Sequence, residues 1–180
     1  MTLAPFSREL TIAQAIEADR VARYYEGQGL RDRYEAAGGL ASDEERPARY
    51  VTSRRAEKAV SVATGLVWNW ADLSRPDVGD DLEVRYRADA LYRGQWFRGA
   101  LAYNPDKDHA DRRYALVWPD EVAIEGEALR PMRFVLVGWV WGSIAAELIG
   151  RRVAKVGGAG FVSPSRLRPF RELPDGRLVL

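Results

Sequence analysis

The first third of the chain has the hydrophobic pattern of helices. In residues 7 to 35, apolar side chains recur at roughly helical spacing with charges between them: Leu10, Ala13, Ile16, Val21 and Tyr24. A second helical pattern covers residues 50 to 64, and its apolar positions can form one face: Val51, Ala56, Ala59, Val60 and Ala63. Gly65 is well placed to end this second helix. The sequence therefore predicts two helical regions before any strand.

The polar stretch between the two helical patterns predicts a boundary. Residues 37–47 are mostly small, charged or proline, which is the composition of a linker. We therefore expect an N-terminal helical extension with its linker at residues 1–46, and a main domain at residues 47–180.

After Gly65 the pattern changes to that of strands. Alternating or continuous apolar runs predict strands at residues 66–70, 82–87, 96–103, 114–118 and 134–141. A short helix is expected at residues 144–152. Because the strands follow one another so closely, mainly antiparallel neighbours are expected, and the fold class is α+β.

One of these strands carries the residues with the clearest chemistry. In residues 82–87 the apolar side chains share one face, and Glu83, Arg85 and Arg87 share the other. The preceding turn contains Pro76 and Asp77. A divalent metal that cleaves phosphodiesters needs hard oxygen ligands from two directions, with open positions for water and phosphate. An acid in a turn beside an acid on a strand supplies such ligands, and a cation two residues further along can neutralise charge on phosphorus.

This pattern resembles the PD-(D/E)XK nuclease superfamily, over residues 51 to 117. The superfamily pattern is Pro-Asp, a spacer, an acid, any residue and lysine, on a strand-turn-strand unit. Pro76, Asp77 and Glu83 match it, whereas Arg85 stands at the position of the lysine. Glu57 matches a glutamate that the superfamily often carries on the preceding helix. The chain also looks like small phage- and prophage-type proteins with a Glu-Val-Arg motif, which have no known activity.

The resemblance implies a restriction-endonuclease-like mixed sheet flanked by helices. It implies that Asp77 and Glu83 bind Mg²⁺ or Mn²⁺, that Arg85 stabilises charge and that Glu57 supports the site. Arginine stays charged at any working pH and cannot shuttle a proton. Lys58 or Arg87 can also stand in for the missing lysine, and Asp72 is an alternative first acid.

Composition narrows the chemistry further. The 180 residues are 47% apolar and contain no cysteine, which excludes disulfides, thiol catalysis and zinc sites built on cysteine. The formal net charge is +1, but residues 148–171 contain six basic residues and no acidic residue. Arg151, Arg152 and Lys155 are expected to contact the DNA backbone, although a solvated basic tail is an equal alternative. Neither a signal peptide nor a membrane span is expected, and the predicted location is the cytoplasm.

Other signals favour structural roles. His109 lies in a very polar loop and is expected to be solvated. The glycines at 157–160 fit neither a P-loop nor a dinucleotide fingerprint. The six tryptophans are expected mainly in the core, with one or two left to flank a DNA groove: Trp68, Trp70, Trp96, Trp118, Trp139 and Trp141.

The predicted function is a metal-dependent nuclease acting on DNA. Two alternatives stay open. One is a catalytically inactive nuclease-like protein that binds nucleic acid, for instance a phage accessory protein. The other is a structural protein that assembles into homo-oligomers through its N-terminal helices.

Overall fold

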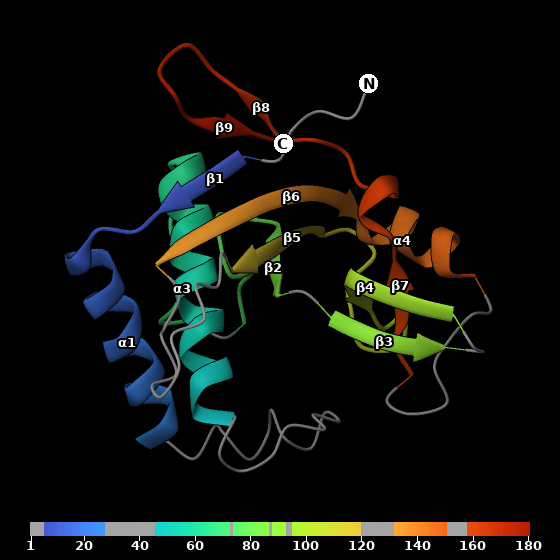
Figure 1. Cartoon of the computed structure of the whole chain (residues 1–180), viewed down its shortest axis with the longest axis horizontal. Helices are drawn as coiled ribbons and strands as arrows, with labels where there is room; N and C mark the ends of the chain where they lie inside the picture. The colour runs from blue at the N-terminus through green and yellow to red at the C-terminus, as the bar shows by residue number, and fades with distance from the viewer. Residues whose placement is uncertain are drawn as a thin grey trace.

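The computed structural model describes most of the chain, as residues 6–27, 46–72, 74–86, 88–92, 95–119, 132–150 and 158–180. These residues form a mixed α+β fold with a mixed sheet (Figure 1). Its helices are α1 (Ile12–Gly27), α3 (Arg46–Thr64), α4 (Gly142–Ile149) and the 3₁₀ turn η1 (Pro164–Arg166). Its strands are β1 (Phe6–Glu9), β2 (Leu82–Tyr86), β3 (Ala88–Tyr92), β4 (Gln95–Tyr103), β5 (Arg113–Pro119), β6 (Arg133–Trp141), β7 (Gly160–Val162), β8 (Arg171–Glu172) and β9 (Leu178–Val179).

The main sheet has four strands in the order β1-β6-β5-β2. β1 and β5 both pair antiparallel with β6, whereas β2 pairs parallel with β5, with Leu82 opposite Arg113. The expectation of mainly antiparallel neighbours is therefore confirmed, and β2 is the exception. β2 lies at the edge of this sheet. The loop that precedes β2 can therefore lie against its free edge, beside the face that carries Glu83 and Arg85.

Two layers cover the main sheet. The helix α3 packs on one face, with α1 beside it, as Figure 1 shows. Its buried positions include the five that the sequence predicted for the helix face: Val51, Ala56, Ala59, Val60 and Ala63. On the other face, α4 packs with the antiparallel sheet β3-β4-β7, and the core between them includes Leu101, Tyr114, Leu116 and Val140.

The N-terminal prediction needs two corrections. Residues 7–9 are not helical, because Phe6–Glu9 pairs with β6 as an edge strand of the main sheet. The predicted apolar face of α1 is also wrong at Ala13, Ile16 and Tyr24, which are exposed, while Tyr25 is buried. The helix is turned toward α3 by Asp19, whose buried carboxylate accepts two hydrogen bonds from Arg55 at 2.7 and 2.9 Å. The spacing of apolar residues gives no information about a buried ion pair, so it could not predict which face of this helix is buried.

The predicted strand at residues 66–70 is reduced to a single bridge, in which Trp68 pairs with Val78. The segment that would have been its partner contains Pro76 and Gly79, and the latter has φ +63. Proline lacks an N–H and a left-handed glycine turns the chain, so a longer ladder cannot form. The sequence reading also missed β3 and the C-terminal hairpin of β8 and β9, which are short.

Gly138 in β6 and Gly142 at the start of α4 are required by close backbone contacts. A Cβ on Gly138 would lie 2.7 Å from the carbonyl oxygen of Arg168, and one on Gly142 would lie 2.2 Å from that of His109. Trp139 and Arg168 exchange two backbone hydrogen bonds at the first crossing. Gly138 therefore lets residues 167–168 cross β6, and Gly142 lets the start of α4 lie against residues 109–110.

No helix in the described part of the chain has the length and apolar character needed to cross a bilayer.

The two acids of α1 that pair with α3 provide a stability test. The Asp19–Arg55 pair is buried, whereas the Lys58 ammonium binds Glu17 at 2.8 Å with the Glu17 side chain about half exposed. Removing one partner of a buried pair costs about 3 kcal/mol or more, and an exposed pair contributes less than about 1 kcal/mol. We expect Asp19→Ala to lower the free energy of unfolding in urea by about 3 kcal/mol and Glu17→Ala by less than about 1 kcal/mol. Equal losses would show that the buried pair does not hold α1 to α3.

Candidate active site

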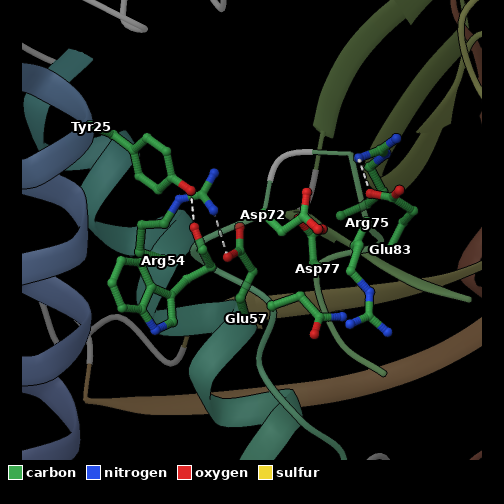
Figure 2. Close-up of a pocket in the computed structure, with 10 residues that line it drawn as sticks. Tyr25, Arg54, Glu57, Asp72, Arg75, Asp77 and Glu83 are labelled. Carbon is green, nitrogen blue, oxygen red and sulfur yellow. Dashed lines mark hydrogen bonds and ion pairs between the residues drawn. The ribbon is translucent and has the colours of Figure 1, made fainter. Parts of the chain in front are cut away.

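A cavity of about 190 Å³ lies where α3, the loop after it and β2 meet. Its lining brings together the site residues that the sequence predicted from three separate segments: Glu57 of α3, Asp77 of the loop, and Glu83 and Arg85 of β2. Figure 2 shows Asp77 between Glu57 and Glu83 in this view. The remaining lining residues are Tyr25, Arg54, Asn69, Trp70, Asp72 and Arg75.

Among Glu57, Asp77 and Glu83, Glu57 is the most buried, with 2% of its surface exposed. Its Oε2 accepts a hydrogen bond from Arg54 at 2.7 Å, one helical turn earlier, and a second from the indole N–H of Trp68 at 3.0 Å. The two donors fix the carboxylate at the wall of the cavity. Because Trp68 is bridged to Val78, the same contact also ties α3 to the loop that carries Asp77.

Asp77 is held by the strand that follows it. Its Oδ2 accepts the backbone N–H of Val84 at 2.8 Å, at the free edge of β2. Its backbone carbonyl accepts the N–H of Asn69 at 2.9 Å, and the Asn69 side chain donates to the carbonyl of Pro76 at 2.9 Å. These bonds bring the Pro-Asp turn against β2 at the position where the sequence motif requires it.

Glu83 and Arg85 belong to a network of charges. The Glu83 carboxylate is bound by Arg112, and it lies 3.7 Å from a guanidinium nitrogen of Arg85. Arg85 also donates to Asp108 at 2.8 Å, and its guanidinium lies over the ring of Tyr114 at 5.0 Å. The side chain of Arg85 is one quarter exposed, so these contacts orient it and still leave it at the cavity. A planar, permanently charged guanidinium held in this way suits phosphate oxygens.

Burial and the negative charge of Asp77 raise the proton affinity of Glu57 and Glu83. Burial, then the negative charge of Asp77, raises the pKa of Glu57 to about 8, against the opposing effects of Arg54 and Trp68. Burial and Asp77 also raise the pKa of Glu83, while Arg85 and Arg112 act in the opposite direction. Like charges crowded into a half-buried space favour the neutral form, or a cation that balances them.

Two of the carboxylates are oxygen donors of the type that hard divalent cations bind. Mg²⁺ usually binds one or two carboxylates and keeps several waters, and Asp77 and Glu83 offer carboxylate oxygens at one cavity. Among the described residues no group of three acidic or imidazole ligands is already close enough to form a metal cage. Glu83 is instead bound by arginine, so a cation would compete with Arg112 for it.

The alternatives from the sequence are now placed. Asp72 lines the cavity but is exposed, and its Oδ1 accepts hydrogen bonds from the backbone and hydroxyl of Ser74. Those two hydrogen bonds lower the pKa of Asp72. Lys58 pairs with Glu17 and does not line the cavity. Asp72 therefore stays within reach of the site, and Lys58 does not take the position of the missing lysine.

Three other sets of predictions concern residues outside the cluster of acids: the basic residues, the histidine and the tryptophans. Arg87, Arg151, Arg152 and Lys155 lie outside the described residues. His109 is exposed, as expected, and its backbone N–H and carbonyl bond the hydroxyl of Tyr114. Trp68 and Trp139 are buried, whereas Trp70 is 36% exposed and lines the cavity.

Sequence reasoning missed several residues of the site. Arg54 precedes Glu57 by three positions on the predicted helix, and that spacing was a signal for the pair. No local signal pointed to Arg112 or Tyr25. Arg112 reaches Glu83 because β5 runs parallel to β2, and Tyr25 comes from a different helix and donates its hydroxyl hydrogen to the carbonyl of Trp70.

Comparisons with protein-family models, with curated proteins and with solved structures gave no match to this chain.

The raised pKa of Glu57 predicts a pH dependence of stability. The unfolded chain releases this proton near the ordinary pKa of 4.5, whereas the folded protein retains it until about 8. The folded state therefore binds more protons between these values, and its stability falls as the pH rises. In metal-free buffer, the free energy of unfolding should fall by roughly 2–4 kcal/mol from pH 5 to pH 8, since one pKa unit is worth about 1.4 kcal/mol. The Glu57→Gln variant should lose most of this slope.

Urea unfolding at a series of pH values measures the effect. Glu147→Gln on α4 is the matched control, because Glu147 is exposed and distant in the fold from the cavity lining. Parallel stability curves for wild type and Glu57→Gln would contradict the raised pKa.

Proposed function

We propose that the protein is a divalent-metal-dependent nuclease that hydrolyses phosphodiester bonds of DNA, built on a restriction-endonuclease-like core of the PD-(D/E)XK type. The supporting observation is that Glu57, Asp77, Glu83 and Arg85 line one cavity although they come from a helix, a loop and a strand. The motif was read as a linear pattern, and the presence of Glu57 at the same cavity supports the proposal.

Asp77 and Glu83 are the proposed ligands of Mg²⁺ or Mn²⁺. The bound ion would supply positive charge that polarises the phosphate and lowers the pKa of a bound water. Asp77 is already fixed by the N–H of Val84 through one oxygen, which leaves its other oxygen to a ligand. Glu83 would exchange part of its contact with Arg112 for the cation.

Arg85 is proposed to bind the phosphate and to stabilise the charge that develops on it. Arginine cannot accept a proton, so a carboxylate must take the proton of the attacking water. Glu57 is the proposed acceptor, because its carboxylate lines the same cavity and is not one of the two proposed metal ligands. As the water oxygen bonds to phosphorus, one P–O ester bond breaks, and the leaving oxygen takes a proton from solvent.

A second candidate is a nuclease-like protein that binds DNA without cutting it, such as a phage accessory or structural protein. The contacts of Glu83 with Arg112 and Arg85 favour it, since these cations already balance one of the acids. Association through the N-terminal helices and a cytoplasmic location stay predictions.

Cleavage assays separate the two candidates. With Mg²⁺ or Mn²⁺, wild type should cleave DNA, and Asp77→Asn and Glu83→Gln should each lower the rate at least about a hundredfold, because each removes a ligand charge. Asp175→Asn and Glu172→Gln are matched controls on the exposed C-terminal hairpin and should cleave as wild type does. Chelation of the metal with EDTA should abolish cleavage by wild type.

Circular dichroism establishes that the variants are folded. Absence of wild-type cleavage with either metal would favour the binding protein. Cleavage that survives both Asp77→Asn and Glu83→Gln would contradict the assigned site.

A further inference from the structure

We propose that Trp70 and Tyr24 form a stacking surface for an unpaired base, so that the site takes single-stranded DNA in preference to duplex. This inference rests on the proposed function, because it assigns the substrate class of the same cavity. Trp70 lines the cavity, and Tyr24 lies against Trp70 with ring centroids 6.3 Å apart and planes at 79°.

Both rings are partly exposed to solvent. Tyr24 is 55% exposed and Trp70 is 36% exposed. Large aromatic side chains gain free energy when their surface leaves water. Exposed rings that touch one another at the rim of a polar cavity therefore offer a surface for a planar ligand.

Trp70 is also held in place before any ligand arrives. The buried hydroxyl of Tyr25 donates a hydrogen bond to the backbone carbonyl of Trp70, and the rings of Tyr24 and Tyr25 contact edge to face at 5.6 Å. The guanidinium of Arg54 lies over the ring of Tyr25 at 5.2 Å. The stacking surface is thus tied to the helix that carries Glu57. Because the rings are already ordered, the protein loses little conformational entropy when a base binds.

The charges around the rings match a nucleic-acid strand. Arg75 lines the cavity with half of its side chain exposed, and its 3.0 Å pair with the exposed Asp80 is a weak surface contact that a phosphate can replace. Arg20 and Arg23 are exposed on α1, and Arg20 is one helical turn before Tyr24. The exposed Asp72 opposes these cations at the same cavity.

The place of the rings favours an unpaired base. The acids and Arg85 line the cavity together with Trp70, so a phosphate held at the acids places a neighbouring base toward Trp70 and Tyr24. A protein ring can cover the face of a base only after the base has left the stack. In a duplex both faces are covered by neighbouring bases, and unstacking costs a few kcal/mol.

Binding measured without cleavage tests the inference. Fluorescence anisotropy in Ca²⁺ would compare a labelled single-stranded oligonucleotide with a hairpin duplex of the same length, for wild type and variants. Wild type should bind the single strand at least about tenfold more tightly. Trp70→Ala and Tyr24→Ala should each weaken that binding about tenfold, since stacking of one base is worth about 1–3 kcal/mol. Trp70→Phe, which keeps a ring, should lose less.

Val67→Ala is the control, because Val67 is exposed, apolar and absent from the cavity lining. It should bind as wild type does. Tyr24→Ala changes an exposed position of α1 and keeps the test valid even if Trp70→Ala fails to fold.

The outcomes separate this inference from the proposed function. Single-strand preference that depends on Trp70 and Tyr24, in a protein that does not cleave DNA, would support the stacking surface and overturn the nuclease. If wild type cleaves DNA but Tyr24→Ala and Trp70→Ala bind single strands as tightly as wild type does, the nuclease would stand and the stacking surface would be overturned. Equal affinity for single strand and duplex, or no binding to either, would also overturn it.

Discussion

The crowding of Glu57, Asp77 and Glu83 around one small cavity is the constraint on which the rest of the site depends. Their negative charges cannot all persist in a half-buried space without protons or cations to balance them. The protein balances them in part with Arg54 and Arg112, and in part by a raised pKa at Glu57. The proposed divalent cation would complete that balance, which is why the acids matter more to the functional proposal than the arginines do.

Much of the fold was predictable because its main elements are periodic. The five apolar positions predicted for the buried face of α3 are all buried, and β2, β4, β5 and β6 lie close to their expected ranges. The candidate site was predictable for a related reason. Pro76 and Asp77 in a turn, followed by Glu83 and Arg85 at alternate positions of a strand, fix their relative placement through local geometry alone.

The remaining features depend on contacts between distant segments. Tyr25 and Arg112 reach the site only because α1 packs on α3 and because β5 runs parallel to β2. The exposed face of α1 was misjudged because Asp19 is buried against Arg55, and an apolar pattern carries no information about a buried ion pair. The position of Trp70 follows from a loop that replaced a predicted strand. Sequence periodicity therefore defined the scaffold, and tertiary contacts decided which side chains surround the acids.

The most direct test of the central claim is anomalous diffraction from crystals of the protein grown with Mn²⁺. A peak in the cavity within coordination distance of Asp77 and Glu83, with Arg112 displaced from Glu83, is the result that the shared cation site predicts. Ordered Asp77 and Glu83 side chains with no peak between them, and Glu83 still bound by Arg112, would contradict it. That outcome would leave an internally balanced cluster of acids and arginines in place of a metal centre.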